Sequence, residues 1–156
     1  KGEDSHRRSL YTEVRRNSPY PSFATFDAPN REVCTIRRGR SNTPLQALAL
    51  MNDVQNFEAA RAFAERMLIR TSSEAERLDF AFRSVTARRP SKEERRLLAD
   101  TLATHRAHFA KQTEDAQHVL TNGESKPNPT LPVGEFAAWT MVANLLFNLD
   151  ETVTRN

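Results

Sequence analysis

The side chains best suited to binding a charged ligand lie close together in the sequence, between residues 27 and 53. They carry guanidinium, carboxylate or amide groups, and they are Asp27, Arg37, Arg38, Arg40, Asn42, Asn52 and Asp53. An irregular segment of this kind that leads into a helix can bind an anion, because guanidinium forks and unpaired backbone amides face the ligand together. The alternative, which we favour, is structural: these groups satisfy the polar backbone of an irregular segment. The pattern assigns a catalytic role to none of them.

The histidines and the single cysteine give weaker signals. His105 and His108 are three residues apart on one predicted helix, a spacing that can bring two imidazoles together at a metal. Because His105 lies on the apolar stripe of that helix, we predict no metal site. Cys34 is the only cysteine, which excludes an internal disulfide. Its neighbours Val33 and Ile36 predict a buried, unreactive thiol, and pairing with a segment outside this chain stays open.

No motif for a cofactor is present in the 156 residues. The four glycines do not cluster into a phosphate-binding loop, and no Cys-x-x-Cys-His sequence is available for covalent attachment of haem. The apolar runs fall well short of the ~20 residues that cross a bilayer. We therefore predict neither a cofactor nor a membrane span in this chain.

The net charge of +3 is unevenly distributed. Residues 1–40 hold nine Lys/Arg against five Asp/Glu, a balance of +4, whereas residues 41–156 hold fourteen against fifteen, a balance of −1. A local basic excess can attract phosphates or acidic sugars. Solvated or carboxylate-paired arginines are the favoured interpretation, and nucleic-acid binding, which rests on this excess alone, is the least favoured function.

The N-terminal residues do not read as a secretory signal, because no apolar region follows the charged residues Lys1 to Arg8. The chain also lacks an initiator methionine. We therefore expect it to be a piece of a longer protein.

Two regions must position the candidate residues. Residues 1–41 are expected to form an irregular or extended arm, because Pro19, Pro21 and Pro29 prevent any long helix. Phe23 and Phe26 are predicted to anchor this polar arm to the rest of the chain. Residues 42–156 are expected to form the helical body of a single domain, so the fold class is all-α.

The body is predicted to be a bundle of about five helices. Their approximate ranges are 44–51, 53–67, 73–88, 91–120 and 133–150, separated by prolines, by the Asn- and Gly-containing loop 122–132 and by capping residues. Thr43-Pro44 gives a helix start, and Ser91 with Glu94 forms a capping box.

The helices differ in how much of their surface is apolar. In the second helix, one stripe carries Phe57, Ala60, Ala64 and Met67 or Leu68, while Glu58, Arg61, Glu65 and Arg66 fill the other face. The last helix is apolar on more than one side, with Ala138, Trp139, Met141, Val142, Leu145, Leu146 and Leu149. We therefore expect it to be buried on more than one side.

Several sequence runs resemble a known family. They are RSLY (8–11), FDAP (26–29), CTIRR (34–38), NTPLQAL (42–48), LMND (50–53) and AWTMVANLLFNLDE (138–151). Together they resemble the C-terminal domain, itself of unknown function, of large secreted planctomycete proteins in a family associated with cytochrome c domains. Asn144 stands where the resemblance implies an arginine.

The resemblance implies an exported protein, located in the periplasm or outside the cell, with haem c possible in another domain and none in this chain. The partners it implies are the other domains of the same parent chain. We therefore predict a non-catalytic structural or interaction module. The alternative is an arginine-lined ligand or catalytic site, formed by the residues from Asp27 to Asp53, for an acidic or sulfated polysaccharide.

Overall fold

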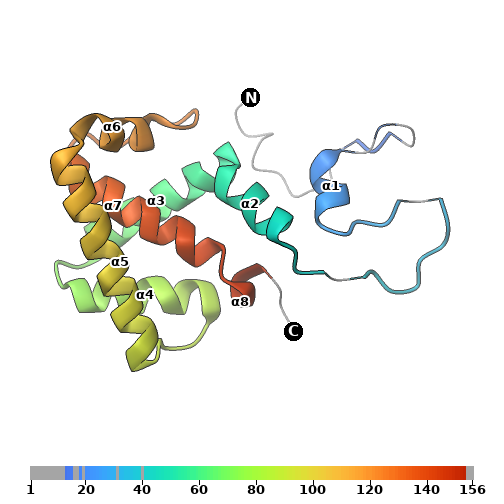
Figure 1. Cartoon of the computed structure of the whole chain (residues 1–156), viewed down its shortest axis with the longest axis horizontal. Helices are drawn as coiled ribbons and strands as arrows, with labels where there is room; N and C mark the ends of the chain where they lie inside the picture. The colour runs from blue at the N-terminus through green and yellow to red at the C-terminus, as the bar shows by residue number, and fades with distance from the viewer. Residues whose placement is uncertain (1–12, 16–17, 19, 31, 40, 154–156) are drawn as a thin grey trace. The chain divides into compact units, whose positions relative to one another are not determined.

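The computed structural model describes residues 13–15, 18, 20–30, 32–39 and 41–153 (Figure 1). The chain divides into two compact units, Lys1–Ala49 (unit 1) and Leu50–Asn156 (unit 2). Within these described residues the secondary structure is helical, apart from an isolated bridge between Arg15 and Ser18. The all-α prediction is therefore confirmed. The predicted number of about five helices is wrong, since the same residues form eight.

Unit 1 contains the short helix α1 (Pro21–Thr25) and most of α2 (Pro44–Asn52). The predicted start at Thr43-Pro44 is confirmed: Oγ1 of Thr43 accepts from the Gln46 amide at 3.3 Å, and Oε1 of Gln46 accepts from the Thr43 amide at 3.0 Å. This reciprocal pair satisfies two amides that a helix N-terminus otherwise leaves without partners. Phe23 packs edge-to-face on Tyr20 at 5.8 Å between ring centroids.

Unit 2 is built from six helices, and one of them, α7, is central. They are α3 (Val54–Arg70), α4 (Glu74–Thr86), α5 (Lys92–Lys111), α6 (Thr113–Thr121), α7 (Val133–Phe147) and α8 (Asp150–Val153). Helix α7 packs against α3, α5 and α6 (Figure 1). A helix with neighbours on several sides needs apolar residues around most of its circumference, and Phe136, Trp139, Val142 and Leu146 are all fully buried. The prediction that the last helix is buried on more than one side is confirmed.

Side-chain caps begin three helices of unit 2. Oδ1 of Asp53 accepts from the Asn56 amide at 2.8 Å and begins α3. Ser73 caps α4, and Ser91 with Glu94 forms the predicted capping box at the start of α5. Each cap satisfies a backbone amide that has no partner within its helix.

Two predicted helices are in fact interrupted. The segment 91–120 breaks at Gln112, where the backbone leaves helical geometry at φ −121° and ψ 76°. The break lets α6 turn and place Ala116 and Leu120 in the core beside α7. The segment 133–150 ends at Phe147, and α8 follows from Asp150.

Two arginines hold helices of unit 2 together. Arg106 of α5 donates twice to the Glu135 carboxylate, at 2.5 and 2.7 Å, and once to Glu74 at 2.5 Å. Arg88 likewise binds both Glu94 and Glu151, and its hydrogen bonds lower the pKa of Glu94 to about 2. Paired, two-pronged bonds of this kind fix the relative orientation of the elements that they join.

None of the described helices is both long enough and apolar enough to span a membrane.

Candidate functional site

A polar cluster around Asp27 closes the loop between α1 and α2. Oδ2 of Asp27 accepts from the Ser41 amide and from the Ser41 hydroxyl, both at 2.7 Å, and from Nε2 of Gln46 at 3.3 Å. Asp27 adopts a left-handed backbone with φ 55°, a conformation that aspartate tolerates better than most residues. We call Asp27, Arg38, Ser41 and Gln46 the clasp, because they join the two ends of the loop.

The other clasp residues bind backbone carbonyls. Nε of Arg38 donates to the Asp27 carbonyl at 2.9 Å, and its Nη2 donates to the Phe26 carbonyl. Nε2 of Gln46 donates to the Thr25 carbonyl at 2.9 Å and to the Ser41 hydroxyl at 3.0 Å. Gln46 is 3 % exposed and is the only buried residue in the described part of unit 1. Hydrogen bonds, rather than an apolar core, therefore hold this loop.

The clasp depends on the charge of Asp27. Hydrogen bonds from the Ser41 side chain, the Ser41 amide and Gln46 lower the pKa of Asp27 below its ordinary value of 3.8. A lowered pKa means that the clasp contributes its full stability above the ordinary value and loses it as the pH falls through the lower, folded value.

We expect Asp27→Asn to loosen the clasp at neutral pH. The amide keeps the shape and one acceptor but loses the charge, and charge-assisted hydrogen bonds are roughly twice as strong as neutral ones. Hydrogen exchange of the Ser41 amide, read by NMR, should accelerate roughly threefold or more. The matched control is Glu32→Gln in the same loop, whose carboxylate accepts a hydrogen bond from Nδ2 of Asn30 and from no other donor among the described residues; an equal acceleration there would show that Asp27 has no special role.

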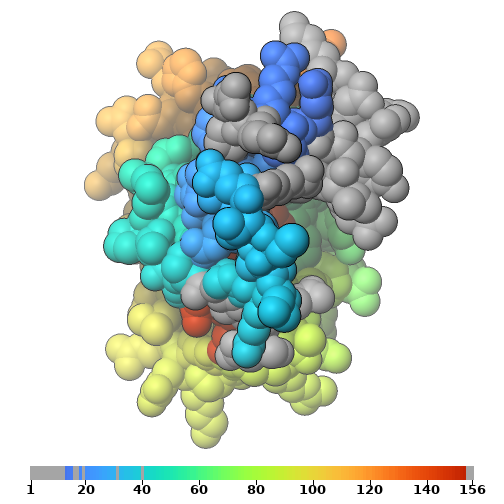
Figure 2. Space-filling view, turned by 90° about the vertical axis from the view of Figure 1, so that its right-hand side faces the viewer, coloured from blue at the N-terminus to red at the C-terminus, as the bar shows by residue number. Residues whose placement is uncertain are grey.

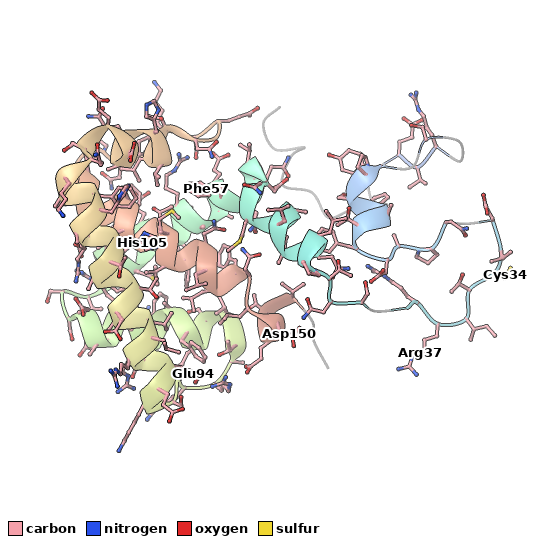
Figure 3. The ribbon with its side chains drawn as sticks, in the orientation of Figure 1. Cys34, Arg37, Phe57, Glu94, His105 and Asp150 are labelled. Carbon is pink, nitrogen blue, oxygen red and sulfur yellow. The ribbon has the colours of Figure 1, made fainter. Side chains whose placement is uncertain are left out.

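The tip of the loop carries exposed apolar side chains. Val33 is 72 % exposed and Ile36 is fully exposed. Cys34 is exposed as well, so the prediction of a buried thiol is wrong. Its apolar neighbours do not bury it, because the loop is closed by polar contacts at its base. Figure 2 shows this loop in light blue on the surface that faces the viewer, and in Figure 3 Cys34 and Arg37 lie on its outer bend.

The predicted ligand-binding residues do not form one site, because they lie in different surroundings. Asp27 and Arg38 come together in the clasp, while Arg37 is exposed and makes no hydrogen bond or ion pair with the described part of the chain. Asn42 and Asn52 each interact within the chain, and Asp53 caps α3. Arg40 lies outside the described residues. The polysaccharide site stays a prediction.

A second polar cluster lies in unit 2 and was not predicted from the sequence. Glu58 is 9 % and Arg61 2 % exposed, so these two residues of the polar face of α3 are buried. Arg61 donates to the Leu120 carbonyl, to the Asn122 carbonyl at 2.7 Å and to the carbonyl and hydroxyl of Ser125 at 2.7 and 2.6 Å. We call Glu58 and Arg61 the loop anchor, because they satisfy the backbone that follows α6.

Glu58 completes the loop anchor from the other side. Its carboxylate accepts from the Ser125 amide at 2.5 Å and from the Glu124 amide at 3.3 Å, and lies 3.4 Å from Arg61. Hydrogen bonding to Ser125 lowers the pKa of Glu58 despite burial, which acts in the opposite direction. The signal that was available is the i, i+3 spacing of the two residues, which permits an ion pair but does not distinguish a buried pair from a solvated one.

Gly123→Ala should destabilise unit 2 through the loop anchor. Gly123 has φ 105°, and a Cβ there would lie 2.9 Å from the Glu58 carboxyl group. A side chain at this φ in so little space should cost about 1–3 kcal/mol of unfolding free energy, measured by urea denaturation. The matched control is Gly134→Ala in α7, whose new Cβ would make an ordinary 3.9 Å contact with Phe109. A loss there as large as at Gly123 would contradict the proposed cause.

The two histidines of α5 lie against other side chains of unit 2. His105 is half-buried beside Phe109, and burial, followed by the charge of His108, lowers the pKa of His105. Nε2 of His108 lies 3.0 Å from Oδ2 of Asp115 across the break between α5 and α6. In the part of the chain that the structure describes, no three His, Cys, Asp or Glu residues gather where they could hold a metal ion.

Comparison with known proteins identifies the family. Residues 1–102, about two thirds of the chain, match PSD1, which is described as a protein of unknown function (DUF1553). The chain therefore belongs to this family. The matched range contains the clasp, the loop that it closes and helices α1 to α4. Searches of curated proteins and of solved structures give no match.

Proposed function

We propose that this chain is a non-catalytic interaction module of a larger, exported protein, and that the loop between α1 and α2 makes the contact. The observation that carries the proposal is the structure of that loop. Its base is fixed by the clasp, while Val33 and Ile36 at its tip are exposed. Two large apolar side chains exposed near the tip of one loop can mark a site of contact with another molecule.

The rest of unit 1 supports the same proposal. Leu45 of α2 is 61 % and Tyr20 55 % exposed, so the exposed apolar residues are not confined to the tip. Unit 2, by contrast, has its own core of buried apolar residues from α3 to α7. Unit 2 can therefore support its own fold, whereas the described part of unit 1 contains no buried apolar residue.

The proposal is tested with one double variant, Val33→Ser with Ile36→Ser, which is made both in the isolated chain and in the full-length protein. In the isolated chain, replacing these exposed side chains should change the unfolding free energy by less than about 0.5 kcal/mol. In the full-length protein the same variant should lower the thermal unfolding midpoint, because a covered apolar contact is lost. Leu97→Ser, at a residue of α5 that is 66 % exposed, is the control and should have no effect in either setting. An equal loss of stability in the isolated chain and in the full-length protein would contradict the proposal.

The location of the protein and the presence of haem in another of its domains are also part of the proposal. Export to the periplasm or beyond, and haem c in another domain of the parent protein, rest on the family resemblance of the sequence runs. A visible absorption spectrum of the purified full-length protein tests the haem, and cell fractionation tests the location.

The polysaccharide alternative retains one supporting observation, the outward position of Arg37. Binding of dextran sulfate, measured by calorimetry, should be lost in Arg37→Ala if this alternative holds. Uncharged dextran is the control, since a guanidinium at a sulfate site acts through charge.

A further inference from the structure

The loop that follows α6 contains a reactive dipeptide, Asn122-Gly123. It is the one place in the sequence where an asparagine precedes a glycine. The side-chain amide of asparagine can react with the backbone nitrogen of the next residue, and glycine hinders this reaction least because it has no Cβ and the freest backbone. Asn122 is exposed, so water reaches its side chain. The dipeptide therefore has the residue types that spontaneous deamidation requires.

The reaction at this dipeptide needs only water. The deprotonated nitrogen of Gly123 attacks Cγ of Asn122, and a bond forms between these two atoms. The bond from Cγ to Nδ2 then breaks, as the side-chain nitrogen takes up a proton and leaves as ammonia. Water opens the resulting succinimide ring at either of its carbonyls. One opening gives aspartate, and the other gives isoaspartate, in which the backbone runs through the side chain and gains one methylene group.

The folded loop holds Asn122 in a geometry that prevents ring closure. Its backbone is extended, with φ −69° and ψ 127°, so the Gly123 nitrogen is turned away from the Asn122 side chain. The nitrogen and Cγ meet only after rotation about ψ. Because the peptide plane is rigid, the same rotation moves the Asn122 carbonyl. That carbonyl accepts from Nη1 of Arg61 at 2.7 Å, so ring closure has to break this hydrogen bond.

The other contacts of the loop anchor oppose the same rotation. Glu58 accepts from the Ser125 amide at 2.5 Å and from the Glu124 amide at 3.3 Å. Arg61 donates to the carbonyl and hydroxyl of Ser125 at 2.7 and 2.6 Å. The carboxyl group of Glu58 also lies against the Gly123 backbone, only 2.9 Å from where a Cβ would be. Ring closure therefore requires a local opening of the loop in which these contacts are lost.

We propose that Asn122 is a site of spontaneous deamidation and that the loop anchor controls its rate. The reaction proceeds from the opened loop, so its rate is the rate in an unstructured chain multiplied by the fraction of molecules in which the loop is open. Isoaspartate then lengthens the backbone ahead of the two amides that Glu58 binds. The modified loop no longer matches the loop anchor, and the modification weakens the contacts that had delayed it.

The first test compares the folded chain with an unstructured reference. The reference is a synthetic peptide of residues 118–127, which carries the same dipeptide without Glu58 and Arg61. Both are incubated under the same conditions at neutral pH, and conversion of Asn122 to aspartate and isoaspartate is followed by peptide mass spectrometry. We expect deamidation in the folded chain to be at least about tenfold slower than in the peptide, because the loop is open in a small fraction of molecules.

Ser125→Ala tests the role of the loop anchor within the folded chain. It removes one acceptor of Arg61 and keeps both charged residues. Loss of a hydrogen bond to a charged group should raise the open fraction, and with it the deamidation rate, about tenfold. The matched control is Ser84→Ala on α4, whose hydroxyl bonds to the Phe80 carbonyl at 2.7 Å within the same helix. It should leave the rate at Asn122 unchanged, and circular dichroism checks that both variants are folded.

Each contrary result would overturn a stated part of this inference. Equal rates in the folded chain and in the peptide would overturn control by the loop anchor, whether or not Ser125→Ala folds. A folded Ser125→Ala chain that reacts no faster than Ser84→Ala would overturn it as well. A peptide that does not deamidate under the same conditions would overturn Asn122 as the site. None of these results depends on the contact proposed for the loop between α1 and α2.

Discussion

Arg61→Ala should lower the unfolding free energy of the chain by about 3–5 kcal/mol, the cost of breaking a buried ion pair. The side chain of Arg61 is 3 % exposed and binds the carbonyls of Leu120, Asn122 and Ser125. Its removal would leave those carbonyls without donors and Glu58 without its cation. Urea denaturation followed by the fluorescence of Trp139, the only tryptophan, measures the loss.

Two further variants define the cause of this loss. Arg66→Ala on the same helix removes an exposed guanidinium that lies 5.9 Å from the Phe63 ring centroid, and it should cost less than about 1 kcal/mol. Arg61→Met with Glu58→Gln removes both charges and should cost less than Arg61→Ala alone, because no buried charge is then left unpaired. A larger loss in the double variant would contradict the account of the loop anchor.

Trp139→Ala should be comparably damaging, with a loss of about 3–5 kcal/mol for emptying a buried aromatic site. Trp139 is fully buried in the central helix α7, and its indole Nε1 donates to Oε1 of Glu135 at 2.7 Å. The variant therefore creates a cavity and removes one donor from the carboxylate that Arg106 also binds. Circular dichroism in urea replaces fluorescence as the measurement.

Trp139→Phe separates these two contributions. It keeps most of the ring volume and loses only the indole donor, so its cost should be smaller than that of Trp139→Ala. Leu97→Ala, at an exposed site on α5, is the control for substitution of a large side chain and should change stability by less than about 0.5 kcal/mol. A loss below about 1 kcal/mol for Trp139→Ala would show that α7 is not the centre of the core.

The helix starts were predictable because their signals are local. Asp53, Ser73 and Ser91 each accept from a backbone amide three residues along the chain, and this geometry depends on no distant contact. The same reasoning holds for Thr43 and Pro44. Where a few neighbouring residues contain the whole interaction, the sequence is enough to locate it.

The break between α5 and α6 was missed because the apolar spacing runs through it. Phe109, Ala116 and Leu120 follow one another at seven and four residues, as they would in one continuous helix. The available signal was the charge order: His108 and Lys111 end α5, and Glu114 and Asp115 begin α6. Cations at a helix C-terminus and anions at a helix N-terminus are both favourable, and together they indicate a boundary.

The candidate site was predicted only in part for a similar reason. The sequence placed Asp27 and Arg38 in one polar region, but their contacts with Ser41 and with the Phe26 carbonyl depend on how the loop closes. Burial of the loop anchor depends on Ser125, more than sixty residues from Glu58 and Arg61. Spacing along one helix carries no information on such a distant partner.

Amide hydrogen exchange of residues 32–39 tests the central claim most directly, since it reports whether another surface covers the loop tip. It is compared between the isolated chain and the full-length protein, with the first turn of α6 as an internal reference. The account predicts that exchange at the tip slows at least about tenfold in the full-length protein, while the reference is unchanged. Equal exchange at the tip in both settings would contradict it.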